Sequence, residues 1–168
     1  MEGKKRKINI IDIAVIILLV VAIAAVGIKL AGNKVQDAVS KKVDCYAEVV
    51  IVGAQPRIFN EMQRQNLVGQ KMVSGNEFLS ATIEDMWLED YICQVQTSEG
   101  VTVDTVDPTQ KNVVVLIKTQ VAEGTASPKI GSQEIRAGKT FIVKTQTFET
   151  SGIIRYVNFG EYTNPYAH

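Results

Sequence analysis

The feature that most constrains this chain is an apolar run near its N-terminus. Residues 8–30 read INIIDIAVIILLVVAIAAVGIKL, and no polar side chain interrupts the run between Ile13 and Ile28. An α-helix rises about 1.5 Å per residue, so this run is long enough to cross a hydrocarbon core of about 30 Å. A soluble domain made from the remaining chain is too small to surround a helix that is apolar on all sides. We therefore predict a transmembrane helix at residues 8–30.

Basic residues beside this run predict its orientation. Basic residues in a short tail before a membrane span usually stay in the cytoplasm. Here that tail contains Lys4, Lys5, Arg6 and Lys7. This predicts a cytoplasmic stub at residues 1–7 and an extracytoplasmic C-terminal part in the cell envelope. The asymmetry is weakened by the basic residues that follow the run, which are Lys29, Lys34, Lys41 and Lys42. A cleaved signal peptide is the alternative, because residues 22–24 (Ala-Ile-Ala) imitate a cleavage site.

After a stalk at residues 31–43, in which apolar residues have helical spacing, the pattern becomes that of β-strands. Segments rich in β-branched and aromatic residues alternate with turn residues. The expected strands are 46–52, 77–84, 91–97, 101–106, 113–121, 140–147 and 152–159, with turns between them that include Asp107-Pro108. Short strands without βαβ alternation predict a mainly β domain at residues 44–168, folded as a compact antiparallel barrel or sandwich.

One segment of this domain has the period of a helix instead of a strand. After Pro56, the residues Ile58, Phe59, Met62 and Leu67 have the spacing of a short amphipathic helix. We expect it to cap one end of the β structure; a mobile recognition helix is the alternative.

The β segments also contain a faint repeat. Residues 68–82 resemble residues 130–145, so that Gly75 aligns with Gly138 and Phe78 with Phe141. A barrel of two duplicated halves would explain this likeness, since two such halves close a sheet and cover its edges.

Charge and cysteine content limit the classes of partner. Acidic residues outnumber basic ones beyond Asp44, which argues against nucleic acid, whose phosphates require a basic surface. The only cysteines are Cys45 and Cys93, and an oxidising compartment would permit a disulfide between them. Two strand thiols that never meet are the equally simple alternative. We expect no metal site, since zinc prefers four ligands and the sole histidine is His168.

The most distinctive candidate site is acidic. Two acidic pairs flank the only tryptophan, and the candidate partner surface consists of Glu84, Asp85, Trp87, Glu89 and Asp90. Carboxylates attract hard cations, but this spacing matches no calcium loop. A solvated edge between strands, with Trp87 packed on the domain, is the simpler interpretation.

Catalytic motifs are weak throughout the sequence. A Ser or Cys nucleophile needs a base that a terminal histidine hardly supplies, and no glycine-rich phosphate loop occurs. Paired carboxylates of a glycosidase type are the remaining enzymatic option, although the spacing selects no pair. We expect no cofactor.

Three stretches resemble a known family. They are KINIID at residues 7–12, VGQKMVSG at 68–75 and GKTFIVKT at 138–145, and together with the apolar run they resemble domain of unknown function 4330. The resemblance implies a bacterial single-pass membrane protein without an assigned activity, so it transfers no functional residue.

These observations favour a non-enzymatic function. We expect a membrane-anchored envelope protein whose external β domain is a binding or assembly module for a protein or polysaccharide partner. The alternative is an envelope hydrolase or carbohydrate-modifying enzyme that uses paired carboxylates. The oligomeric state and the identity of the partner stay open.

Overall fold

A computed structural model describes residues 15–23 and 41–166 of the chain. Residues 15–23 are helical, and the chain forms two units, residues 1–41 and the domain that begins at Lys42. Within the described residues, neither helix combines the length and apolar character needed to cross a membrane. Most of the predicted transmembrane helix (8–30), the basic stub (1–7) and the stalk (31–43) lies outside the described residues.

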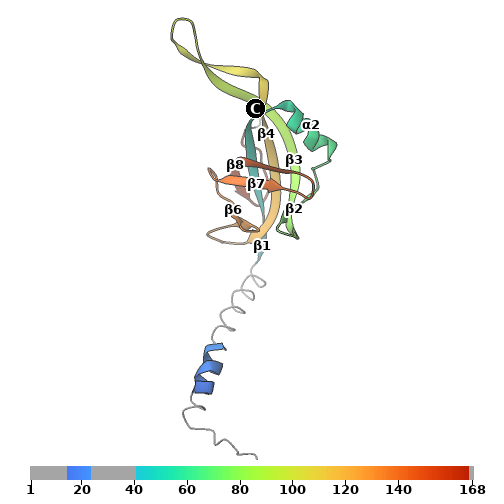
Figure 1. The fold of residues 1–168 in the computed structure, drawn as a ribbon, viewed down its shortest axis with the longest axis vertical. Coiled ribbons are helices and arrows are strands. Elements are labelled where there is room, and N and C mark those ends of the chain that lie inside the picture. The colour runs from blue at the N-terminus through green and yellow to red at the C-terminus, as the bar shows by residue number, and fades with distance from the viewer. Residues whose placement is uncertain (1–14, 24–40, 167–168) are drawn as a thin grey trace, which may run out of the picture. The chain divides into compact units, whose positions relative to one another are not determined.

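The domain is a mainly β structure built around one six-stranded antiparallel sheet (Figure 1). Along the chain the elements are β1 (Lys42–Ala54), α2 (Pro56–Arg64), β2 (Lys71–Ser74), β3 (Glu77–Gln96), β4 (Thr102–Ala122), β5 (Lys129–Ile130), β6 (Gln133–Glu134), β7 (Thr140–Lys144) and β8 (Glu149–Phe159). The strand order is β2-β3-β4-β1-β8-β7, and β5 pairs with β6 in a separate small hairpin. The edge strands β2 and β7 approach each other, so the sheet curls into a barrel that is nearly closed.

The concave face of the sheet holds the core. Alternate residues of the central strands, such as Val49 on β1 and Val115 on β4, are completely buried, as the period of two requires. The predicted helix is present as α2, with Pro56 at its first position. Phe59 and Met62 are buried in this core, which confirms that the apolar face of the helix packs onto the β structure.

Two expected strand breaks are wrong. The segments 77–84 and 91–97 belong to the single strand β3, and 101–106 and 113–121 belong to β4. The turn predicted at Asp107-Pro108 lies inside β4, where the β3–β4 register shifts between Asp90 and Ile92. Asp107 accepts a hydrogen bond from the Thr109 N–H at 2.7 Å, as an aspartate does in a turn. Here this hydrogen bond lies within a local bulge and does not end the strand. A bulge also tolerates the missing N–H of Pro108.

The long strands β3 and β4 continue beyond the barrel as a two-stranded hairpin. This arm, residues 91–107, projects away from the sheet in Figure 1 as the yellow-green ribbon. The partner of β4 on its other side, β1, ends at Ala54 opposite Lys111. Among the described residues, the arm strands therefore pair only with each other.

The outer face of the sheet carries a second buried layer. Val50, Val114 and Leu116 are buried but stand apart from the main core. The C-terminal tail begins with the Gly160 N–H donating to the Asp44 carbonyl at 2.8 Å. Its Tyr162 ring lies 5.4 Å from the Tyr46 ring on β1. The tail thus covers part of the outer face with aromatic side chains.

Candidate binding site

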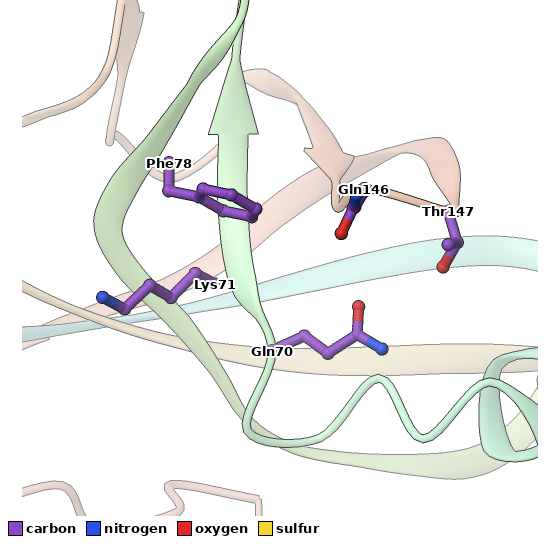
Figure 2. A pocket seen from close by; sticks show the side chains of 5 residues that line it. All are labelled: Gln70, Lys71, Phe78, Gln146 and Thr147. Atoms are coloured by element: carbon purple, nitrogen blue, oxygen red, sulfur yellow. The ribbon is translucent and has the colours of Figure 1, made fainter.

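An open pocket of about 330 Å³ lies at the seam where the barrel fails to close. Its walls come from the two edges of the sheet: the start of β2, the start of β3, and the turn between β7 and β8. The lining residues, which Figure 2 shows as sticks, are Gln70, Lys71, Phe78, Gln146 and Thr147.

Local hydrogen bonds fix the polar side of this pocket. The Gln70 side-chain nitrogen donates to the carbonyls of Gln65 at 2.8 Å and Asn66 at 3.2 Å. Its amide oxygen is then directed toward Gln146 and Thr147, as Figure 2 shows. Across the pocket, the Thr145 hydroxyl accepts the Phe148 N–H at 3.2 Å and holds the β7–β8 turn. The pocket therefore presents an oriented acceptor opposite an amide and a hydroxyl.

The apolar side of the pocket is one exposed aromatic ring. Phe78 stands near the start of β3, just after the tight β2–β3 turn, and 62% of its surface is accessible. An aromatic ring exposed to this extent gains little from the fold, so its apolar surface is available to a ligand. The arrangement of a ring with a few convergent amide and hydroxyl groups suits a small polar ligand that has an apolar face.

The residues of the predicted acidic surface do not form one surface in the structure. All five of its residues lie on β3. The Trp87 indole N–H donates to a Glu89 oxygen at 2.9 Å, so these two side chains are engaged within the domain. Asp90 forms an ion pair with Lys111 at 2.6 Å. Glu84 and Asp85 are exposed, so the stretch does not present one continuous acidic surface.

Glu89 belongs to a partly buried charged cluster that sequence reasoning missed. Arg155 on β8 donates to Glu48 through Nε at 2.9 Å and Nη2 at 2.7 Å. It also donates to Glu89 through Nη1 at 2.7 Å. The Tyr162 hydroxyl donates to the other Glu48 oxygen at 2.6 Å. Glu48 is completely buried, and the Tyr166 ring stacks 4.1 Å from the guanidinium carbon.

The electrostatics of this cluster favour a structural role. The hydrogen bond from Arg155 lowers the pKa of Glu89 below its usual value, and burial with the Glu48 hydrogen bond raises the pKa of Tyr162. A glycosidase acid needs a carboxyl whose pKa is raised. Glu48 and Glu89 do lie on either side of one guanidinium, but that cation favours the ionised form of Glu89, which is the opposite of what a glycosidase acid needs. The signal in the sequence was a single acid inside the apolar strand YAEVVIV.

The two cysteines lie at distant points of the sheet and are free thiols. Cys45 is opposite Thr119 on β4, whereas Cys93 is opposite Thr105 on the same strand. Strand residues advance about 3.3 Å each, so the pair is separated far beyond the roughly 7 Å limit for a disulfide. The disulfide between them is therefore not formed. No group of three or more His, Cys, Asp or Glu residues suited to a metal ion occurs in the described part of the chain.

These features define a barrel-like β domain with an open pocket at its seam, lined by polar side chains and one exposed phenylalanine. The chain belongs to the family described as domain of unknown function DUF4330, whose sequence pattern matches residues 3–158. The comparisons found no matching curated protein and no matching solved structure.

Proposed function

We propose that this chain is a membrane-anchored envelope protein whose β domain is a binding module for a polysaccharide. The observation that carries the proposal is the exposed Phe78 ring beside Gln70, Gln146 and Thr147. A sugar ring has an apolar face that packs on an aromatic ring, and its hydroxyl groups both donate and accept hydrogen bonds. Amide side chains match hydroxyl groups because each amide carries one acceptor and two donors.

The shape of the pocket suits part of a polymer better than an enclosed small molecule. It lies open at the sheet edge, so a bound segment is not enclosed on all sides. Phe78 and the β7–β8 turn stand on opposite sides of it in Figure 2. The carboxylate chemistry of a hydrolase has less support, because no carboxyl group lines this pocket.

The membrane anchor is part of the same proposal. The helical residues 15–23 are apolar throughout and exposed throughout, which supports contact with lipid. With Lys4 to Lys7 in the cytoplasm, the β domain lies outside the cell membrane, where envelope polysaccharide is present.

Duplication would explain why the barrel has a seam. The strand order is β2-β3-β4-β1-β8-β7. If β1 exchanges with β4, β2 with β7 and β3 with β8, the result is the same order read from the opposite edge of the sheet. Gly69 donates to the Ile83 carbonyl and Gly138 to the Ile154 carbonyl, so the equivalent glycines are Gly69 and Gly138. The sequence alignment of Phe78 with Phe141 is therefore out of register: Phe78 is exposed and Phe141 is completely buried. We infer two related halves whose outer strands β2 and β7 form the seam.

Cosedimentation of the detergent-solubilised full chain with purified peptidoglycan tests the binding proposal. We expect the wild-type chain to sediment and Phe78→Ala to bind about tenfold more weakly, because the stacking surface is lost. Phe159→Ala is the matched control, since Phe159 is also an exposed phenylalanine but does not line the pocket. Equal binding by both variants, or no binding by the wild type, would contradict the proposal.

A further inference from the structure

The arm leaves one strand edge without the usual protection against pairing. A two-stranded hairpin is marginally stable alone, and natural edge strands are normally guarded by charge, proline or a bulge. The β4 edge of the arm has such guards in Asp104, Asp107 and Pro108. The β3 edge, residues 91–98 with the sequence YICQVQTS, contains neither charge nor proline. This asymmetry marks the β3 edge as a surface kept free for a partner strand.

The hydrogen-bond pattern shows which groups point outward from this edge. At the tip, the Thr97 N–H donates to the Val101 carbonyl at 2.8 Å, so the backbone N–H of Thr97 points toward β4. Antiparallel pairs alternate, which directs the N–H and C=O groups of Ile92, Gln94 and Gln96 away from β4. The open edge therefore offers three successive residues with their donors and acceptors ready for another strand.

We propose that the occupant of this edge is the same edge of a second copy of the chain. A two-fold axis through Gln94 places Gln94 opposite its equivalent and Ile92 opposite Gln96 of the other copy. The backbone N–H and C=O groups of all these residues point away from β4, so about six backbone hydrogen bonds form between the two copies. Side chains match as well: Cys93 faces Val95, and the two Gln94 amides bond to each other as amides do in stacked strands.

Charge permits this pairing between identical chains. The charges on the β4 strand of the arm are both acidic, Asp104 and Asp107, and would repel if they met directly; the remaining charge of the arm, Glu99, lies in the turn at its tip. Edge-to-edge pairing through β3 puts the two β4 strands three strand spacings apart, or roughly 14 Å. That distance exceeds the Debye length of about 8 Å at physiological salt, so repulsion between the β4 carboxylates of the two copies is largely screened.

Apolar exposure on the arm supports a larger sheet. Ile92 is 62% accessible and Val95 is 42% accessible, which is a high exposure for β-branched residues on a narrow ribbon. Four paired strands bury the edges and widen both faces, and sheets of three or more strands gain the stability that a lone hairpin lacks. Isologous two-fold pairing also closes the assembly at two copies.

Sedimentation velocity on the full chain in detergent tests the pairing. We expect a dimer for the wild type and a monomer for Gln94→Lys, which places two ammonium groups against each other on the axis. Thr102→Lys is the matched control, because it adds the same charge to the exposed β4 edge of the same arm and should stay dimeric. Trp87 fluorescence checks that each variant is folded. A monomeric wild type, or equal behaviour of the two lysine variants, would overturn the proposal.

A disulfide trap tests the register independently. Val95→Cys places a new thiol opposite Cys93 of the other copy in a non-hydrogen-bonded pair, where Cα atoms are about 4.5 Å apart and a disulfide can form. Mild oxidation should convert this variant to a covalent dimer. The double variant Val95→Cys with Cys93→Ser should stay uncrosslinked. Its only thiols on this edge are the two at position 95, which lie diagonal to each other across the interface rather than directly opposite. Crosslinking of the double variant, or none in the single variant, would refute the register.

Discussion

At the scale of single residues, the feature with the largest energetic consequence is Glu48. Burying a carboxylate is costly unless cations and donors surround it, and here Arg155 and Tyr162 occupy both of its oxygens. The stacked Tyr166 ring covers the other side of the guanidinium. The cluster links β1, β3, β8 and the C-terminal tail, so it joins segments that are distant in the chain.

Substitution of Glu48 by Gln should destabilise the domain by about 3 kcal/mol. The change leaves the partly buried Arg155 with Glu89 as its remaining carboxylate partner, and an amide nitrogen replaces one acceptor oxygen. Urea unfolding of the full chain, followed by the fluorescence of Trp87 within the same cluster, measures this loss. Glu61→Gln is the control, because its ion pair with Arg64 is on the surface of α2 and contributes less than about 1 kcal/mol. An equal effect of both substitutions would contradict the assignment.

Tyr162 should make the free energy of unfolding depend on pH in the alkaline range. Burial and the Glu48 hydrogen bond raise its pKa in the folded domain above the ordinary value of 10.0, so its contribution is complete below pH 10. As pH rises further, the unfolded chain loses this proton first and the free energy of unfolding falls. Tyr162→Phe removes the titrating hydroxyl, and its unfolding free energy should decline less between about pH 10 and 11. Parallel slopes for the two proteins would show that Tyr162 is not coupled to folding.

At the scale of elements, the close approach of β8 to β1 at the end of their ladder requires a glycine. A Cβ added to Gly152 would lie 2.6 Å from the Val50 carbonyl oxygen, and backbone cannot move aside as a flexible side chain can. The residue is therefore required by packing rather than by a turn.

Gly152→Ala should lower the free energy of unfolding by about 1–3 kcal/mol, because the methyl group forces β8 away from β1. Thermal unfolding of the purified chain measures the change. Ser151→Ala provides the comparison, since Ser151 is the exposed neighbour on the same strand and should have an effect within about 0.5 kcal/mol. A neutral Gly152→Ala would mean that β8 has more freedom than its register with β1 suggests.

At the scale of the whole molecule, the two thiols provide a test of the proposed extracytoplasmic location of the domain. Cys45 is completely buried, and burial raises its pKa to about 11, whereas Cys93 on the arm is partly exposed. A thiolate must form and be reached before it reacts with a maleimide. The two cysteines should therefore differ strongly in labelling.

A membrane-impermeant maleimide added to intact cells should label the wild-type chain and not Cys93→Ser. This result follows if the β domain is outside the cytoplasmic membrane, as the basic residues 4–7 predict. Cys45→Ser should label like the wild type. Labelling of the wild-type chain only after cell lysis would place the domain in the cytoplasm, and the polysaccharide proposal would then lose its ligand.

Local patterns in the sequence determined the β class, the helix after Pro56 and membership of the family. Each of these depends on periodicity, turn chemistry or short motifs that neighbouring residues carry by themselves. The length of β3 and β4 was decided by tertiary pairing, since bulges absorb Pro108 and the Ile83–Asp85 shift without ending the strands. The seam pocket and the buried Glu48 cluster also arise only in three dimensions. Their members are up to 114 residues apart, and no local spacing brings Glu48 to Tyr162.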